Sequence, residues 1–365
     1  MIDPDYPVAE LVVMGFEGKT LSPSTVSTIE KEKAPLFILF SRNYESKEQL
    51  VALTDELQAR TRFSSATPPA IVSADQEGGR VQRFRSGFTL LPPALEIGRK
   101  NSPGIAFDLA SIQARELFAA GIQLNFAPVC DINTNPANPV IGDRAFGSTA
   151  DSVTRMASAV VRGHLAEGVE PCIKHFPGHG DTRVDSHESL PVVDTPIETL
   201  KTREWIPFQR AMKSGANFLM SAHLLLPHLD PVRPGTLSPA FLKEHLRGTL
   251  MYQGVVISDD MEMGAITGNF GAEEAPVMAL QAGCDLLCYR SEAAALIAIE
   301  SIKKAISGKR LDPQALKVSI DRTRKIRANL RLASKELDRA TRLSIIGSPG
   351  HEALIRTRLA PDSSR

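Results

Sequence analysis

The residues with the richest potential for catalysis lie in one segment, which contains glycine and proline and runs from Lys174 to His187. Within 13 residues it holds three histidines and two aspartates, namely His175, His179, Asp181, Asp185 and His187. Histidine and carboxylate side chains are common metal ligands, so His175, His179 and His187 could hold the metal ion of a hydrolase. Metal-dependent hydrolysis is therefore one chemistry open to this segment.

The other chemistry is acid–base catalysis by His187. Asp185 lies two residues before it, so in a turn its carboxylate accepts from one ring nitrogen and leaves the other facing a substrate. Such a carboxylate fixes the tautomer and stabilises imidazolium, which raises the pKa of the histidine above its reference value of roughly 6.5. We favour this interpretation because zinc ligands usually follow a tighter spacing than these three histidines. We therefore expect neither a metal nor another cofactor.

A pair of aspartates, Asp259 and Asp260, ends the apolar run that starts at Gly254. One of them could cap the following helix, but a cap does not explain both. A carboxylate at the end of a buried strand can attack an anomeric carbon and form a covalent intermediate, which water then resolves. We expect Asp259 to be the attacking group and Asp260 to support it.

Other charged residues follow apolar runs elsewhere in the chain. The paired oxygens of Asp75 could hold two adjacent sugar hydroxyls, while Arg83, Arg144 and Lys174 could donate to other hydroxyls or to an acyl group. Asp75, Lys174 and Asp259 directly adjoin apolar residues, where an unpaired charge would be costly. Asp75, Arg83, Arg144 and Lys174 are therefore candidates for substrate binding.

The elements that position these residues can be predicted from hydrophobic patterning. Eight short apolar runs, each nearly continuous, have the composition of parallel strands that are buried on both faces. The runs are Leu11–Phe16, Pro35–Phe40, Ala70–Ala74, Asn125–Ile132, Pro171–Phe176, Asn217–Ala222, Gly254–Ser258 and Asp285–Tyr289. Polar or ionisable residues follow seven of the eight runs.

Helices are predicted between the runs, and several of them end at a glycine that suits a left-handed terminus. The predicted helices are Ser46–Arg62, Ala106–Ala120, Asp151–Glu167, Thr195–Ser214, Ala272–Ala282, Pro313–Leu332 and one that Ser238 caps. Eight strand-then-helix units predict an α/β fold, a single-domain (β/α)₈ TIM-type barrel, in which the chemistry lies at the carboxyl ends of the strands. A doubly wound sheet is the alternative, but the expected phosphate-binding loops are missing.

Composition limits the partners and the compartment. The chain has 365 residues, with 42 basic and 42 acidic side chains, so broad electrostatic capture of nucleic acid or membrane is not expected. No apolar stretch approaches the roughly 18 residues of a membrane span, and the four cysteines suggest buried thiols rather than disulfides. We expect a cytoplasmic monomer with a catalytic barrel over residues 1–332 and a partly disordered C-terminal appendage over residues 333–365.

Several blocks of the sequence resemble the single-domain β-N-acetylglucosaminidases of glycoside hydrolase family 3, and they occur in the order found in that family. The blocks begin at Asp75 (DQEGGRVQR), Gly142 (GDRAFG), Lys174 (KHFPGHG), Asp185 (DSH) and Ser258 (SDDM). Together they are specific, and the resemblance spans roughly residues 8 to 330.

The resemblance implies a retaining hydrolase that removes terminal, non-reducing β-linked N-acetylglucosamine. It implies Asp259 as the nucleophile, His187 as the acid/base and Asp185 as the partner of that histidine. It also implies sugar-binding roles for a further set of residues, Asp75, Arg83, Arg144, Lys174 and His175. Single-domain members look like cytoplasmic enzymes of bacterial cell-wall recycling, so the expected substrate is a saccharide of N-acetylglucosamine joined to anhydro-N-acetylmuramic acid, with or without peptide.

Overall fold

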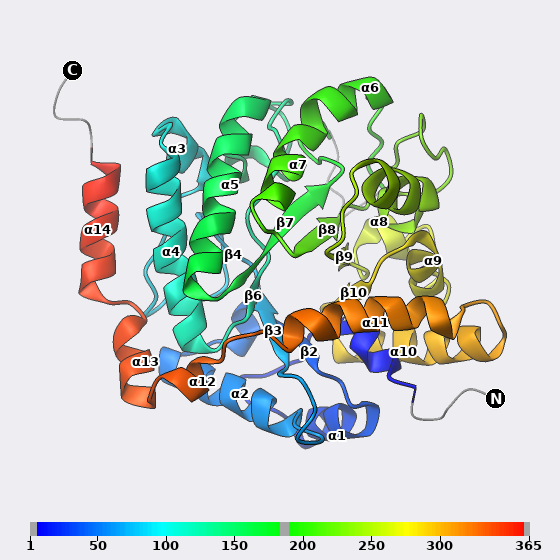
Figure 1. The fold of residues 1–365 in the computed structure, drawn as a ribbon, viewed down its shortest axis with the longest axis horizontal. Helices are drawn as coiled ribbons and strands as arrows, with labels where there is room; N and C mark the ends of the chain where they lie inside the picture. The colour runs from blue at the N-terminus through cyan, green and yellow to red at the C-terminus, as the bar shows by residue number, and fades with distance from the viewer. Residues whose placement is uncertain (1–5, 183–189, 361–365) are drawn as a thin grey trace.

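Eight parallel strands close into a barrel, which confirms the predicted (β/α)₈ architecture. The computed structural model describes residues 6–182 and 190–360 (Figure 1). Around the barrel the strands follow the order β1, β10, β9, β8, β7, β6, β3 and β2. They are β1 (Val12–Met14), β2 (Leu36–Leu39), β3 (Ile71–Ala74), β6 (Leu124–Asn125), β7 (Glu170–Phe176), β8 (Phe218–Ser221), β9 (Val255–Asp260) and β10 (Leu286–Tyr289). A separate antiparallel pair, β4 (Gln76–Gly78) and β5 (Val81–Gln82), follows β3.

Helices surround the barrel in the described residues (Figure 1). They are α1 (Pro23–Glu32), α2 (Lys47–Arg60), α3 (Ala94–Arg99), α4 (Pro103–Ala120), α5 (Ala150–Glu167), α6 (Ile197–Thr199), α7 (Trp205–Lys213), α8 (Gly264–Thr267), α9 (Ala275–Ala282), α10 (Glu292–Ser307), α11 (Pro313–Arg327), α12 (Ala333–Glu336), α13 (Arg339–Ile345) and α14 (Pro349–Leu359). As predicted, α4, α5 and α9 end at glycines with positive φ, namely Gly121, Gly168 and Gly283.

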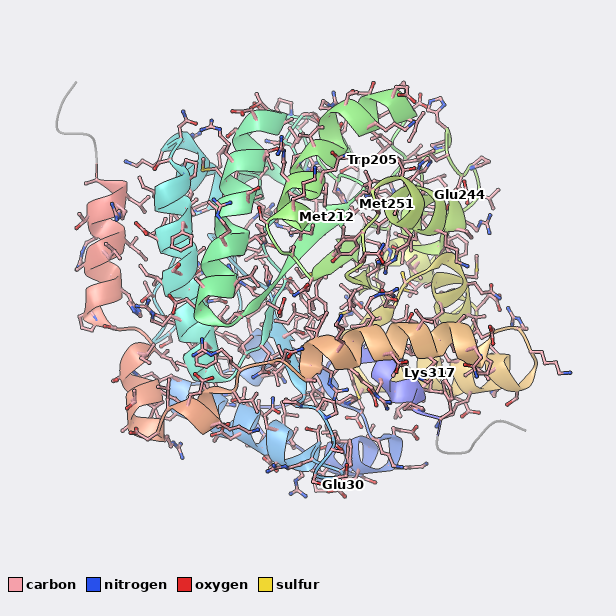
Figure 2. All side chains as sticks on the ribbon, in the orientation of Figure 1. Glu30, Trp205, Met212, Glu244, Met251 and Lys317 are labelled. Carbon is pink, nitrogen blue, oxygen red and sulfur yellow. The ribbon has the colours of Figure 1, made fainter. Side chains whose placement is uncertain are left out.

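Two apolar layers hold the barrel together. A small cluster fills its interior, with Val13, Ile38, Phe126 and Cys172 among its members. A much larger cluster lies between the strands and the helices. Trp205 belongs to this outer layer: it is fully buried at the start of α7 and stacks on Phe176 of β7 at a centroid distance of 5.8 Å (Figure 2). All four cysteines are buried and free, as the sequence predicts.

Several predicted element boundaries are wrong. The fourth strand covers only Leu124–Asn125. Pro128 has no amide hydrogen for a ladder, and only an isolated bridge between Val129 and Lys174 follows. The predicted helix Thr195–Ser214 is interrupted by a π-helical segment, Leu200–Glu204.

Two predicted helix ends also differ from the structure. Ser238 does not cap its helix, the π-helix Ala240–Thr249, because its hydroxyl donates to Asp230 at 2.8 Å instead. The predicted helix Pro313–Leu332 stops at Arg327, since Asn329 and Leu330 bond three positions back and tighten the last turn.

The described part of the C-terminal segment forms the helices α12 to α14, and α14 lies beside α4 at the edge of the molecule (Figure 1). Arg342 of α13 is buried and donates to the carbonyl of Ala119 and to Asp55. His351 of α14 lies 2.7 Å from the buried carboxylate of Glu116. The division into a barrel over residues 1–332 and an appendage over residues 333–365 stays a prediction. In the described ranges, 6–182 and 190–360, no helix combines the length and apolar character that crossing a bilayer requires.

Candidate active site

A cavity of about 520 Å³ opens at the carboxyl ends of the barrel strands, the end at which barrel enzymes carry their chemistry. Its lining includes six of the predicted site residues: Asp75, Arg83, Arg144, Lys174, His175 and Asp259. The other two, Asp185 and His187, lie outside the described residues. The volume is in the usual range for a small-molecule site.

The wall of the cavity carries a chain of alternating charges. Lys174 of β7 donates to Asp75 at 2.8 Å and forms an ion pair with Glu77 at 2.7 Å. Asp75 also accepts from Arg83 at 2.9 Å, while Glu77 binds Arg144 through two hydrogen bonds of 2.9 and 2.7 Å. The order is therefore Arg83, Asp75, Lys174, Glu77, Arg144. Lys174 is buried and the other four side chains are partly exposed. Because each charge has an opposite partner, the fold can place five of them beside one another.

The chain of charges controls the protonation of its members. Burial alone would raise the pKa of Asp75, but the charges of Lys174 and Arg83 outweigh it and hold the pKa well below its usual range. Burial is likewise outweighed at Glu77, where Arg144 and Lys174 lower the pKa to about 2. Burial would lower the pKa of Lys174, but Asp75 and Glu77 raise it instead. At neutral pH all of these groups are ionised.

Two glycines let the backbone reverse between Glu77 and Arg83. Gly78 and Gly79 have φ values of 118° and 55°, which an L side chain rarely adopts. A Cβ at Gly78 would also lie 2.6 Å from the carbonyl oxygen of Pro92. The β4–β5 turn therefore requires glycine, and it returns Arg83 to Asp75.

Asp131 anchors the histidine segment. Its carboxylate accepts from the backbone N–H of His179 at 2.7 Å and from that of His175 at 3.2 Å, and it also accepts from Nδ1 of His175 at 2.7 Å. Nδ1 of His175 therefore carries a hydrogen, and Nε2 lies 3.3 Å from Arg144. The carboxylate thus directs Nε2 of His175 toward the cavity.

Asp259 lies near the end of β9, and its carboxylate accepts from the backbone N–H of Asp260 at 2.8 Å. Burial would raise its pKa, but the neighbouring His175 and His223 lower it, so the carboxylate is ionised. Asp260 differs: burial raises its pKa to about 6, although Arg290 lies 3.5 Å away. The two adjacent aspartates therefore have different charges in mildly acidic solution.

His223, which follows β8, holds the backbone next to Asp259. Its Nε2 lies 3.1 Å from the carbonyl oxygen of Asp260, so this nitrogen donates. Nδ1 forms a hydrogen bond of 2.9 Å with the hydroxyl group of Thr236, which also donates to the carbonyl of Ala222 at 3.1 Å. His223 thus ties the end of β9 to β8.

The two described histidines of the segment considered as an alternative metal site, His175 and His179, make other contacts. Nδ1 of His175 faces Asp131, and Nδ1 of His179 lies 3.0 Å from the hydroxyl of Thr182. Burial lowers the pKa of His179 to about 4. No group of three or more histidine, cysteine, aspartate or glutamate side chains within residues 6–182 and 190–360 is placed to hold a metal ion.

Sequence reasoning missed Glu77, Asp131 and His223 as parts of this site. Glu77 could have been found, because it is two residues from Asp75 and so lies on the same face of an extended segment. Asp131 lies near the end of one apolar run and His223 follows another, but nothing in the sequence identifies their partners. The roles assigned above to Asp75, Arg83, Arg144, Lys174, His175 and Asp259 stay predictions.

Comparison with known proteins agrees with this geometry. Residues 5–326 match the model of the glycosyl hydrolase family 3 N-terminal domain. A beta-hexosaminidase of Xylella fastidiosa is 35% identical over 314 residues, which cover 84% of this chain and 90% of the relative. A beta-hexosaminidase of Alkalilimnicola ehrlichii is 39% identical over 295 residues, which cover 77% of this chain and 81% of the relative.

Solved structures show the same fold. A glycoside hydrolase family 3 beta-N-acetylglucosaminidase from Paenibacillus sp. superposes with a TM-score of 0.89 at 34% identity, covering 98% of this chain and 68% of that one. NagZ from Neisseria gonorrhoeae, in complex with N-trifluoroacetyl-D-glucosamine, superposes with a TM-score of 0.78 at 29% identity, covering 96% of this chain and 97% of that one. The chain belongs to glycosyl hydrolase family 3.

Proposed function

We propose that this chain is a retaining exo-β-N-acetylhexosaminidase that releases terminal, non-reducing β-linked N-acetylglucosamine. The observation that carries the proposal is the ionised, partly buried carboxylate of Asp259, which faces the same cavity as the charge chain from Arg83 to Arg144. The names of the relatives, beta-hexosaminidase and beta-N-acetylglucosaminidase, support the same activity.

In the first step, a carboxylate oxygen of Asp259 attacks the anomeric carbon. The bond from that carbon to the leaving oxygen breaks, and His187 protonates the leaving oxygen. In the second step, His187 takes a proton from water, the water oxygen bonds to the anomeric carbon, and Asp259 leaves. Asp185 orients His187 in this scheme.

The binding residues position the sugar. Arg83, Arg144, Lys174 and Nε2 of His175 present hydrogen-bonding groups to the cavity, and Asp75 supplies acceptor oxygens. Because these groups are already paired with one another, they change position little when sugar hydroxyls share their hydrogen bonds, which favours preorganised binding.

For the biological substrate we propose fragments of peptidoglycan, N-acetylglucosamine joined to anhydro-N-acetylmuramic acid with or without peptide, hydrolysed by a cytoplasmic monomer during cell-wall recycling. The expectation rests on the sequence resemblance to single-domain members of the family. It is tested by comparing kcat/KM for such a fragment with that for chitobiose, which shares the terminal sugar. A higher value for chitobiose would contradict it.

The activity is tested with a chromogenic N-acetylglucosaminide. We expect hydrolysis with the β-anomer formed first, as read by NMR, and no turnover by Asp259→Ala. Azide should restore turnover to Asp259→Ala and give the α-glycosyl azide, because the anion replaces the missing nucleophile from the same face. Asp143→Asn, at the exposed rim, is the matched control and should retain activity. Initial formation of the α-anomer would contradict retention.

The alternative, a metal-dependent hydrolase that uses His175, His179 and His187, is separated from this proposal by exhaustive chelation. A glycosidase that works through Asp259 should keep its full activity after chelation, whereas the metal-dependent enzyme should lose it and regain it with added metal.

A further inference from the structure

The side chain of Asn125, at the end of β6, takes the place of a backbone peptide in hydrogen bonding to Gln76 beside the cavity. Its side-chain oxygen accepts from the N–H of Gln76 at 2.9 Å, and its side-chain nitrogen donates to the carbonyl of the same residue at 2.9 Å. The register of β3 and β6 ends at Ala74 and Asn125, so the carboxamide continues the ladder by one peptide. Gln76 is the residue between Asp75 and Glu77, the two carboxylates of the charge chain.

Gln76 repeats the arrangement one step further. Its side-chain nitrogen donates to the carbonyl of Phe84 at 2.8 Å, and its side-chain oxygen accepts from the N–H of Phe84 at 3.2 Å. Phe84 directly follows Arg83, the cation at one end of the charge chain. Both carboxamides are buried, with exposures of 0% for Asn125 and 2% for Gln76. Two neutral side chains therefore fix the backbone that carries Asp75, Glu77 and Arg83.

His164 of α5 determines which way the carboxamide of Asn125 faces. Nδ1 of His164 lies 3.0 Å from the carbonyl oxygen of Val160, so it must donate. Nε2 is then an acceptor, and the side-chain nitrogen of Asn125 donates to it at 2.9 Å. Burial lowers the pKa of His164 to about 4, which keeps the ring neutral at neutral pH. The oxygen of Asn125 is thereby directed at the N–H of Gln76.

We propose that Asn125 and Gln76 are positioning residues of the active site, which hold Asp75, Glu77 and Arg83 in their binding geometry through paired carboxamide-to-backbone hydrogen bonds. The inference rests on the proposed function only because KM and kcat are measured by the hydrolysis of an N-acetylglucosaminide. A carboxamide suits this role because it presents one donor and one acceptor side, as a peptide does, and carries no charge.

The nearly isosteric variant Asn125→Asp tests the proposal. An ionised aspartate cannot donate to Gln76 or to His164, so we expect KM to rise by about tenfold, with a smaller change in kcat. Burial raises the pKa of such a carboxyl, and its protonated form restores one donor. The ratio of the variant's KM to that of the wild type should therefore increase with pH between pH 5 and pH 9.

Gln123 provides the matched control. It precedes β6, is buried, accepts from the N–H of Val72 at 3.0 Å and donates to the carbonyl of Gly121 at 2.9 Å, but it does not line the cavity. Gln123→Glu should lower Tm to an extent similar to Asn125→Asp and leave KM within about twofold of the wild type.

A second variant covers the case in which Asn125→Asp does not fold. Gln76→Met removes both bonds to Phe84 but leaves the backbone of Gln76 paired with Asn125, and we expect it to raise KM as well. If Asn125→Asp and Gln76→Met had the same KM as Gln123→Glu, the positioning role would be overturned. Crystal structures of the variants test the role without an activity assay. If the side chains of Asp75 and Arg83 occupy the same positions as in the wild type, the positioning role is also overturned. Failure of the wild type to hydrolyse the glucosaminide would count against the proposed function instead.

Discussion

Lys174 and Glu77 form a buried ion pair, with the ammonium nitrogen 2.7 Å from the carboxylate oxygen and exposures of 2% and 6%. The same lysine lies 2.8 Å from Asp75, and the same glutamate binds Arg144. The cavity wall is therefore stabilised by pairs that join Lys174 of β7 to Glu77 of β4 and to Asp75, which lies between β3 and β4. The charged groups for which we propose substrate binding therefore depend on one another for their orientation.

Glu77→Gln tests this dependence. The substitution leaves Lys174 and Arg144 with one anionic partner fewer in a buried site, so the free energy of unfolding should fall by about 3 kcal/mol or more. Because both cations lose orientation, KM for the chromogenic glucosaminide should rise about tenfold. The measurements are urea unfolding and steady-state kinetics.

Glu10→Gln is the control for that prediction. Glu10 lies outside the cavity lining and binds Arg324 and the buried Arg327, so it also links two cations. Its substitution should destabilise the fold while KM is unchanged. A similar rise of KM in both variants would mean that general destabilisation, and not the cavity pair, determines substrate binding.

Asp260→Asn tests the influence of the second aspartate on the pH profile. Because the pKa of Asp260 is about 6, its carboxyl is neutral below that pH and charged above it. The added negative charge favours positive charge that develops at the anomeric carbon, so kcat/KM of the wild type should rise through pH 6 by about tenfold. The variant should lack this rise and match the wild type near pH 5. If kcat/KM of Asp260→Asn still rose through pH 6 as in the wild type, the rise would belong to the titration of another group.

Much of the fold could be predicted because parallel barrel strands are buried on both faces and so appear as uninterrupted apolar runs. All eight strands lie where such runs occur. The fourth was predicted to extend too far, because residues Phe126 to Ile132 are buried and, apart from Asp131, apolar. Burial and strand pairing are different properties, and the amino-acid composition of a segment predicts its burial but not its pairing.

A position at the cavity could be predicted for charged residues near the carboxyl end of an apolar run, as for Asp259 and Lys174, whose roles stay predictions. It was not predictable where the function of a side chain lies in its contact with another segment. Asp131 matters because two backbone N–H groups from the histidine segment point at it, and Asn125 because Gln76 lies beside it. Such pairs are separated by about 40 to 50 residues, and no local pattern records them.

His187→Ala tests the proposed acid/base. Without a proton donor the leaving oxygen must depart as an anion, so substrates with poor leaving groups should lose about 10²- to 10⁴-fold in kcat/KM, and dinitrophenyl glycosides should lose little. His228→Ala is the control, since this half-exposed histidine pairs with Asp194 at 2.9 Å and has no part in the scheme. Equal losses for good and poor leaving groups would exclude His187 as the acid.

The stability of the fold should depend on pH through its buried histidines. The pKa of His164 is about 4 in the folded state and roughly 6.5 when unfolded, so the unfolded chain binds the proton first as pH falls. The stability that His164 contributes is fully present above pH 6.5 and should decrease by about 2 kcal/mol between pH 7 and pH 5.

Asp260, with its raised pKa, acts in the opposite direction, so the informative quantity is the difference between wild type and variant. Urea unfolding at several pH values should show that His164→Gln loses about 2 kcal/mol less than the wild type over this interval. The exposed variant His228→Gln should follow the wild-type curve, and a His164→Gln curve parallel to it would show that His164 titrates alike in both states.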